Sequence, residues 1–259
     1  GGHRYEGTTA VMQPQPDNER DYYETGVTFN NSVSFSKATD NVSFRIGFNN
    51  VDAQGLIPTT FMKKNVLNLA GTIDITSKLT ASLNFNYATS ILSGEFDDGY
   101  SNQTTGSFNQ WFHRNLDMKI MRELKDLRTP QGIWASWNHQ NPTVYNPANE
   151  RPFYAGNYWY NFYKWFDLVN LVTNTDRYFG DISLNYQLHK NWKLRGTYRK
   201  QQNLVWAEQK YKTDLAESGT QTSGNCGECL GYYGTNTSNA NTTNMEAQLT
   251  FTRKYNKIN

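Results

Sequence analysis

Residues 25–50 read TGVTFNNSVSFSKATDNVSFRIGFNN, and apolar and polar side chains alternate through most of this stretch. Successive side chains of a β-strand point to opposite faces of the sheet, so a period of two predicts strands with one apolar and one polar face. The segment KATDN, residues 37–41, interrupts the alternation with residues that favour turns. The stretch therefore predicts a β-hairpin.

The same alternation returns further along the chain, and together the segments predict seven strands. It is found in KNVLNLAGTIDIT, KLTASLNFNYATS, RYFGDISLNYQLHKNWKLRGTYRK and NMEAQLTFTRKY. We expect a lead-in over 1–24, four strands within 25–90, a long loop over 91–174, two strands within 175–207, a second long loop over 208–242 and a strand within 243–259.

Short and long connections alternate along the chain, which favours a meander of antiparallel strands. Outer-membrane β-barrels place tight turns on the periplasmic side and long loops outside the cell, and their strands need only about 10 residues to cross. No stretch approaches the roughly 18 apolar residues of a membrane-spanning helix, and the mean hydropathy is -0.78. The sequence therefore predicts an all-β fold: an antiparallel transmembrane β-barrel segment with long extracellular loops, one of which contains a short helix near 112–127.

The predicted polar face is unusually rich in charge, and in a barrel it would line the lumen. A soluble β-sandwich would show the same face to water, so this alternative stays open. The polar residues expected to face the lumen are Arg45, Asp74, Asp181, Lys193, Arg195 and Glu246.

The loop over 91–174 carries a dense group of aromatic residues among Asn and Gly. Aromatic faces stack on sugar rings and anchor protein interfaces, but they also pack loops and form membrane girdles, so all these roles remain open. The candidates for contact with cargo or with a lid protein are Trp134, Trp137, Tyr154, Tyr158, Trp159 and Trp165.

The sequence gives few signs of a redox, metal, nucleic-acid-binding or catalytic site. Cys226 and Cys229 have the CxxC spacing of zinc or redox sites, but no second pair accompanies them, and we expect a surface-loop disulfide. A net charge of +2 lacks the basic concentration that nucleic acid binding needs. No nucleophile triad, phosphate loop, metal-ligand set or cofactor motif is recognisable, so we expect neither an enzyme nor a metal or cofactor site.

Residues 17–90 resemble the early barrel of SusC/RagA-type TonB-dependent outer-membrane transporters. The resemblance lies in ordered pieces: the strand over 25–36, Arg45, the QG-x-x-P loop over 54–58 and the return over 64–68. Residues 175–200 are similar to strands that follow the first large loop in that family.

The resemblance implies uptake of oligosaccharides or peptides across the outer membrane of a Gram-negative bacterium. It implies a barrel of about 22 strands closed by a plug, a SusD-like surface lipoprotein as a lid, and energy supplied through TonB. Seven strands cannot close such a barrel, so we expect the plug, the TonB box and the remaining strands outside this chain. The alternatives are a soluble carbohydrate-binding β-sandwich module and a passive porin or barrel adhesin.

Overall fold

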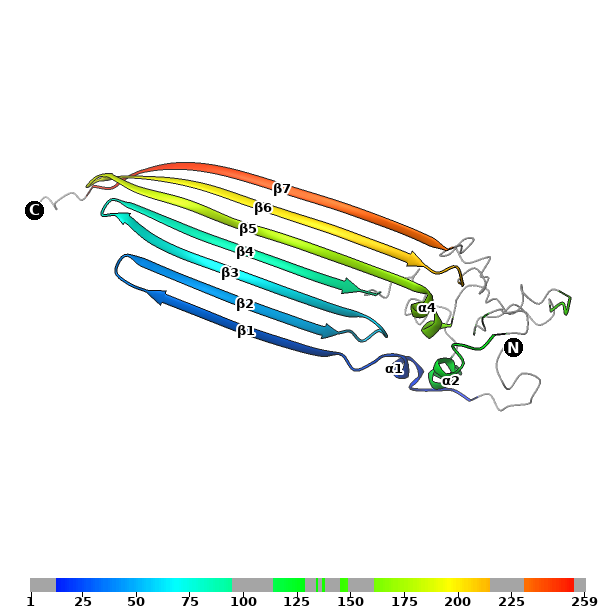
Figure 1. The fold of residues 1–259 in the computed structure, drawn as a ribbon. Helices are drawn as coiled ribbons and strands as arrows, with labels where there is room; N and C mark the ends of the chain where they lie inside the picture. Colours follow the sequence, from blue (N-terminus) through cyan, green and yellow to red (C-terminus); the bar gives the residue numbers. More distant parts are fainter. Residues whose placement is uncertain are drawn as a thin grey trace, which may run out of the picture.

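In the part of the chain that the structure describes, the fold is one antiparallel sheet of seven strands with three short helices at one end (Figure 1). The computed structural model describes residues 13–94, 114–128, 134, 137, 145–148, 161–214 and 231–253. The strands are β1 (Val27–Ala38), β2 (Val42–Gln54), β3 (Phe61–Thr76), β4 (Leu79–Ser93), β5 (Val169–His189), β6 (Trp192–Tyr211) and β7 (Tyr232–Phe251). The helices are α1 (Asn18–Tyr22), α2 (Met118–Glu123) and α4 (Phe162–Leu168).

Every strand pairs with its neighbour in sequence, so the sheet is a simple meander in the order β1 to β7. The turns at 39–41, 77–78 and 190–191 lie at one end, which we call the turn end. The opposite strand ends, including Gln54, Ser93 and Tyr211, lie at the other end, which we call the loop end, together with the three described helices (Figure 1). The seven-stranded antiparallel all-β fold predicted from the sequence is confirmed.

Short side chains close the tight turns. The Thr39 hydroxyl accepts a hydrogen bond from the Val42 amide at 3.2 Å. The Thr76 hydroxyl accepts from the amides of Lys78 and Leu79 at 3.2 and 3.1 Å. These local contacts set the register of the first two hairpins, because a turn fixes which residues face each other across the pair.

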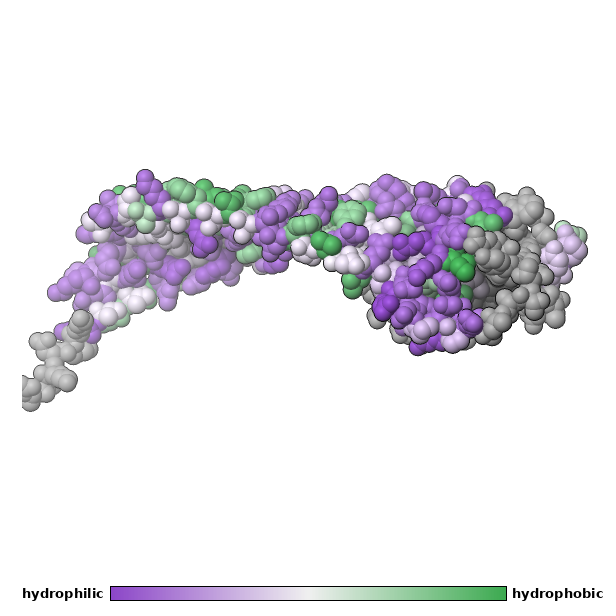
Figure 2. All heavy atoms as spheres, turned by 90° about the horizontal axis from the view of Figure 1, so that it is seen from below, coloured by the Kyte–Doolittle hydropathy of each residue, from purple (hydrophilic) through white to green (hydrophobic). Residues whose placement is uncertain are grey.

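One face of the sheet is apolar and uncovered. Directly paired residues share a face, and the pairing brings the predicted apolar rows of all seven strands to the same side. The exposed fractions are large, at 65% for Phe29, 67% for Val33 and 76% for Met245. Figure 2 shows hydrophobic residues gathered along one side of the sheet and hydrophilic residues along the other.

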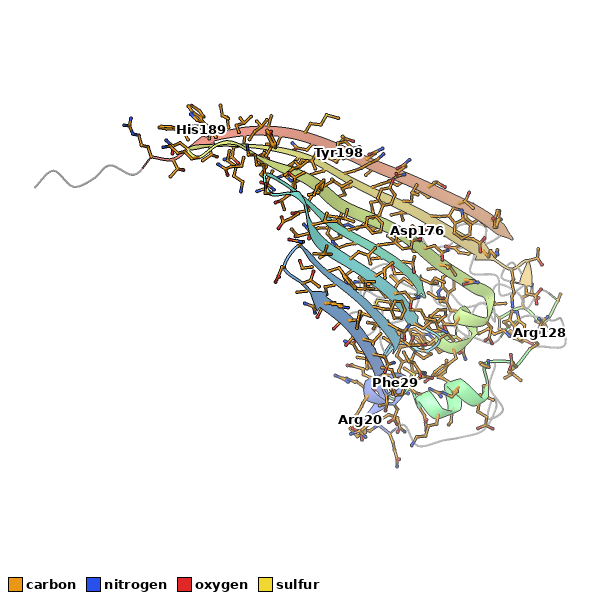
Figure 3. The ribbon with its side chains drawn as sticks, turned by 60° about the vertical axis from the view of Figure 1, so that its left-hand side comes forward. Arg20, Phe29, Arg128, Asp176, His189 and Tyr198 are labelled. Atoms are coloured by element: carbon orange, nitrogen blue, oxygen red, sulfur yellow. The ribbon has the colours of Figure 1, made fainter. Side chains whose placement is uncertain are left out.

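The buried core lies at the loop end and not under the sheet. Among the residues whose placement is described, the buried apolar side chains are Tyr22, Met118, Met121, Trp134, Phe162, Tyr163, Trp165, Leu168 and Val169. None of the described helices is long and apolar enough to cross a membrane. The sheet itself curls along its width, with His189 at the turn end and Arg20 and Arg128 at the loop end (Figure 3).

Several elements extend beyond their predicted limits. The strand pairing continues to Ser93 and resumes at Val169, inside the loop expected over 91–174. It also runs to Tyr211 and from Tyr232, inside the loop expected over 208–242. The β7 extension is mainly polar on both faces, and residues 169–174 of β5 carry apolar side chains on both, so neither alternates and only the backbone pairing shows the strand.

The helical content of the long loop also differs from expectation. The helix α2 covers Met118–Glu123, a part of the span near 112–127, and the second helix α4 was not predicted. The side chain of Asp117 accepts hydrogen bonds from the amides of Lys119 and Ile120 and so caps the start of α2.

Candidate functional site

The loop end of the sheet is closed by a small assembly of helices, and it is the first candidate site. Tyr22 of α1 is fully buried, and its ring meets that of Phe162 edge to face at 5.9 Å between centroids. Met118 and Met121 of α2 complete the same cluster. The segment before β1 thus packs against α2 and α4, which precede β5 in the chain, at the loop end of the sheet.

Asn161 joins two of these helices. Its side-chain oxygen accepts hydrogen bonds from the amides of Tyr163 and Lys164 at 3.0 and 3.4 Å, which caps α4. Its side-chain nitrogen donates to the carbonyl of Met121 at 2.9 Å. Because Asn161 is buried, both its donor and its acceptor are used inside the protein.

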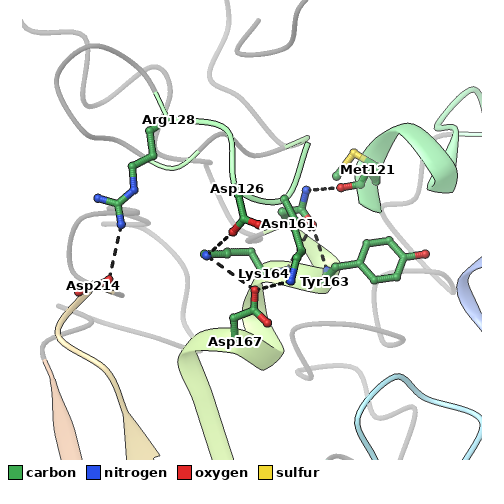
Figure 4. A network of polar contacts seen from close by, with 9 residues as sticks. Met121, Asp126, Arg128, Asn161, Tyr163, Lys164, Asp167 and Asp214 are labelled. Carbon is green, nitrogen blue, oxygen red and sulfur yellow. Dashed lines mark hydrogen bonds and ion pairs between the residues drawn. The ribbon is translucent and has the colours of Figure 1, made fainter. Parts of the chain in front are cut away.

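A buried lysine organises the charges around α4 (Figure 4). The Lys164 ammonium lies 2.7 Å from an Asp126 carboxylate oxygen and 3.7 Å from Asp167. Lys125 lies 2.7 Å from the same Asp167 oxygen, so Asp167 is shared between two cations. The hydrogen bond from Lys164 lowers the pKa of Asp126, and the nearby positive charges act in the same direction.

Ion pairs also link the N-terminal segment to the loop. Arg114 lies 2.9 Å from Glu19, and Arg122 lies 3.7 Å from Glu24. The Arg122 guanidinium also lies over the ring of Tyr163, 4.7 Å from its centroid, while burial raises the pKa of the Tyr163 hydroxyl. These exposed pairs contribute orientation more than stability.

The predicted aromatic candidates divide into three groups. Trp134 is buried, with the Arg128 and Lys164 cations 3.5 and 3.7 Å from its ring centroid, and Trp165 is buried against Tyr211. Trp137 is half-buried and stacks on Phe162 at 5.4 Å. Tyr154, Tyr158 and Trp159 lie outside the described residues.

This burial favours loop packing, one of the roles that the sequence left open, for Trp134 and Trp165, and their contact with cargo or a lid stays a prediction. A ring that contacts cargo needs an accessible face, and the faces of Trp134 and Trp165 pack against the protein. Their role in this structure is to hold the loop against α4 and the ends of β5 and β6.

The polar face of the sheet is the second candidate site. A hollow of about 610 Å³ lies on it, lined mostly by small or hydroxyl side chains together with Arg45, Asn84, Asp181 and Arg195. The strand register places Asp74, Lys193 and Glu246 on this same face. All six predicted polar residues therefore share one face of the sheet.

Several of these polar residues are paired across strands. Arg199 lies 2.7 Å from Glu246, Asn84 donates to Asp181 at 3.4 Å, and Thr80 donates to Asp74 at 2.6 Å. The face thus offers hydroxyls, amides and charges of both signs. That mixture suits a hydrated surface in contact with polar molecules.

Cys226 and Cys229 lie outside the described residues, and their pairing stays a prediction. No group of His, Cys, Asp or Glu in the described ranges could hold a metal ion. Sequence reasoning missed Lys164 and Tyr22 as organising residues of the loop end. The signal for the first was the spacing of Lys164 and Asp167, which places opposite charges on one side of a helix.

Comparison with solved structures finds similar folds, while the sequence comparisons find nothing. No family model and no curated protein matches the sequence. The structure is similar to that of the RagAB peptide importer in its closed-closed state, with a TM-score of 0.53 and 11% identity over 83% of this chain. The likeness establishes the fold of this chain as that of a β-barrel section. The chain spans 22% of the length of that importer chain.

Proposed function

We propose that this chain forms part of the barrel wall of an outer-membrane transporter that imports large nutrients. One observation carries the proposal: an apolar face that continues across all seven strands and that no described element covers. A soluble sandwich would bury such a face beneath a second sheet. A bilayer satisfies it directly, because barrel strands alternate between lipid and lumen.

In this proposal the polar face lines the path of the nutrient. Arg45, Asp74, Asp181, Lys193, Arg195 and Glu246 face the lumen, where water or a plug domain satisfies their charges. The hollow near Arg45 and Arg195 belongs to this inner surface. Energy supplied through TonB and a plug outside this chain follow from the sequence resemblance described above.

The loop-end assembly lies on the cell-surface side, where it forms part of the outer vestibule. Trp137, Tyr154, Tyr158 and Trp159 are the aromatic residues of this region that we propose for contact with cargo or with a SusD-like lipoprotein lid. The structural likeness to a peptide importer supports a peptide as the cargo, and the sequence resemblance described above keeps an oligosaccharide as the alternative.

The test uses the full-length polypeptide that contains this chain, expressed in a strain that lacks it. We expect the protein in the outer-membrane fraction, with a change in electrophoretic mobility on heating, and growth on peptides or oligosaccharides as the sole nutrient. Recovery as a soluble protein would overturn the barrel. Membrane insertion with growth that persists after TonB is deleted would overturn active transport and favour a passive porin.

A further inference from the structure

The apolar face does not end at the same row of paired residues on every strand. The positions where it ends on each strand bear on how the sheet would lie in a bilayer. One row of directly paired residues on this face passes through Val33, Phe48 and Leu67 of β1 to β3 and then through Tyr87 and Tyr178 of β4 and β5. The row thus changes from aliphatic and phenyl side chains to tyrosines. Tyrosine is the residue type that marks the boundary between hydrocarbon and water.

The same row ends in amides on the last two strands. Tyr178 faces Gln202 of β6, and Gln202 faces Asn241 of β7. The amide of Gln202 hydrogen bonds the side chain of Asn239 at 3.2 Å and also contacts the Tyr178 hydroxyl. Polar groups that bond one another along the strands are suited to an aqueous boundary and costly in hydrocarbon.

The opposite limit of the apolar face shifts in the same direction. Along β1 the apolar side chains stop before Lys37, which is paired with Phe44 of β2. Along β6 and β7 they continue to the pair Trp192 and Phe251 at the turn end. Both limits therefore move toward the turn end from β1 to β7. The apolar face is a diagonal band of roughly constant width.

The tight turns follow the same diagonal. The first hairpin closes with Ala38 opposite Ser43, and the later hairpins close progressively further along the ladder, with His189 opposite Trp192 in the last. The shift is about 1.5 residues per strand. With about 3.3 Å per residue and about 4.8 Å between strands, it corresponds to a tilt of about 45°, at the upper end of the range of membrane barrels.

We propose that the bilayer meets this sheet along the diagonal band, so that the loop-end parts of β5, β6 and β7 stand outside the membrane as a projecting wall. This inference rests on the proposed function. The wall includes residues 199–211 of β6 and 232–244 of β7, about 40 Å along each strand. Trp206 and Leu204, 37% and 36% exposed on the side of the apolar band, belong to this wall and not to a membrane girdle.

The test measures depth with spin labels at single cysteines in the intact protein, in bilayers and without native cysteines. Leu67→Cys and Asn241→Cys share one row, and we expect the first label to collide with oxygen and the second with a water-soluble nickel chelate. Ile73→Cys and Ala247→Cys share a row that lies wholly within the band, and both should prefer oxygen.

Each outcome has a distinct meaning. Equal preferences at Leu67 and Asn241 would overturn the diagonal boundary while leaving membrane insertion intact. Preference for the chelate at all four positions would refute the membrane barrel itself. If the Leu67 variant fails to assemble, Val33→Cys occupies the same row and gives the same comparison.

Discussion

Lys164 shows how a single charged residue can organise a loop. It is only 7% exposed, and its ammonium is held by Asp126 and Asp167 beside the ring of Trp134. A buried cation is tolerated only with such partners, because unpaired burial of a charge is costly. The residue therefore links the segment after α2 to α4 and through it to β5.

Replacing Lys164 by Met keeps most of the side-chain volume and removes the charge. We expect a loss of about 1.5–3 kcal/mol in the local stability of the loop end, the range for hydrogen bonds to charged groups. Hydrogen exchange of residues 118–128 and 161–168 measures it. Lys210→Met is the control, because the Lys210 side chain is 51% exposed, and unchanged exchange in the Lys164 variant would contradict the prediction.

The lowered pKa of Asp126 makes the stability of the Lys164 network depend on pH. Its pKa is lowered from 3.8 by Lys164, so its contribution is complete above that value and is lost as the pH falls through the lowered pKa of the folded state. We expect faster exchange in residues 118–128 only at such acidic pH. Asp126→Asn should remove this dependence, and the same acid response in that variant would show that another group is responsible.

Leu83 tests the environment of the apolar face. It lies 42% exposed near the middle of the apolar part of β4. Leu83→Arg should destabilise the assembled barrel by about 2–4 kcal/mol, the cost of arginine near the bilayer midplane. Ser82→Arg, on the opposite face beside the hollow, should fold normally. Urea titration in lipid vesicles compares the two, and equal effects would contradict the assignment of faces.

At the scale of elements, α1 connects the start of β1 with the helices before β5. Tyr22→Ala removes a fully buried ring, and such changes cost about 3–5 kcal/mol when the site cannot collapse. We expect proteolysis within the α2 region at lower protease concentration. Tyr23→Ala is the matched control, since Tyr23 is 39% exposed, and equal protease sensitivity of the two variants would refute the packing role of Tyr22.

Alternation predicted the strands where one face is apolar and missed their ends where the two faces do not differ in polarity. Residues 232–244 of β7 consist largely of Thr, Asn and Ser, and only the pairing with β6 reveals the strand. The sequence did not predict α4, because its aromatic residues continue a longer aromatic run and so show no helical spacing. Trp134 packs beside Lys164 of α4, a contact between segments far apart in the sequence, and no local pattern carries that information.

For the whole molecule, the proposed transport role is tested most sharply at two aromatic residues of the long loop that lie outside the described residues. Tyr158→Ala with Trp159→Ala in the full-length protein should reduce uptake by at least tenfold if each anchor contributes about 1–2 kcal/mol. Growth on candidate nutrients and co-purification of the lid are measured together. Lost growth with the lid retained supports cargo contact, loss of both supports the lid seat, and no change in either contradicts the vestibule.

The meander has a consequence for the order in which the molecule folds. Six strand pairs join sequence neighbours, but β4 and β5 are separated by the long insertion that carries α2 and α4. Closing a long loop costs more entropy than closing a two-residue turn, and distant pairings form slowly. We therefore expect β1–β4 and β5–β7 to form as two separate units, with the ladder between Tyr87 and Tyr178 joining them last.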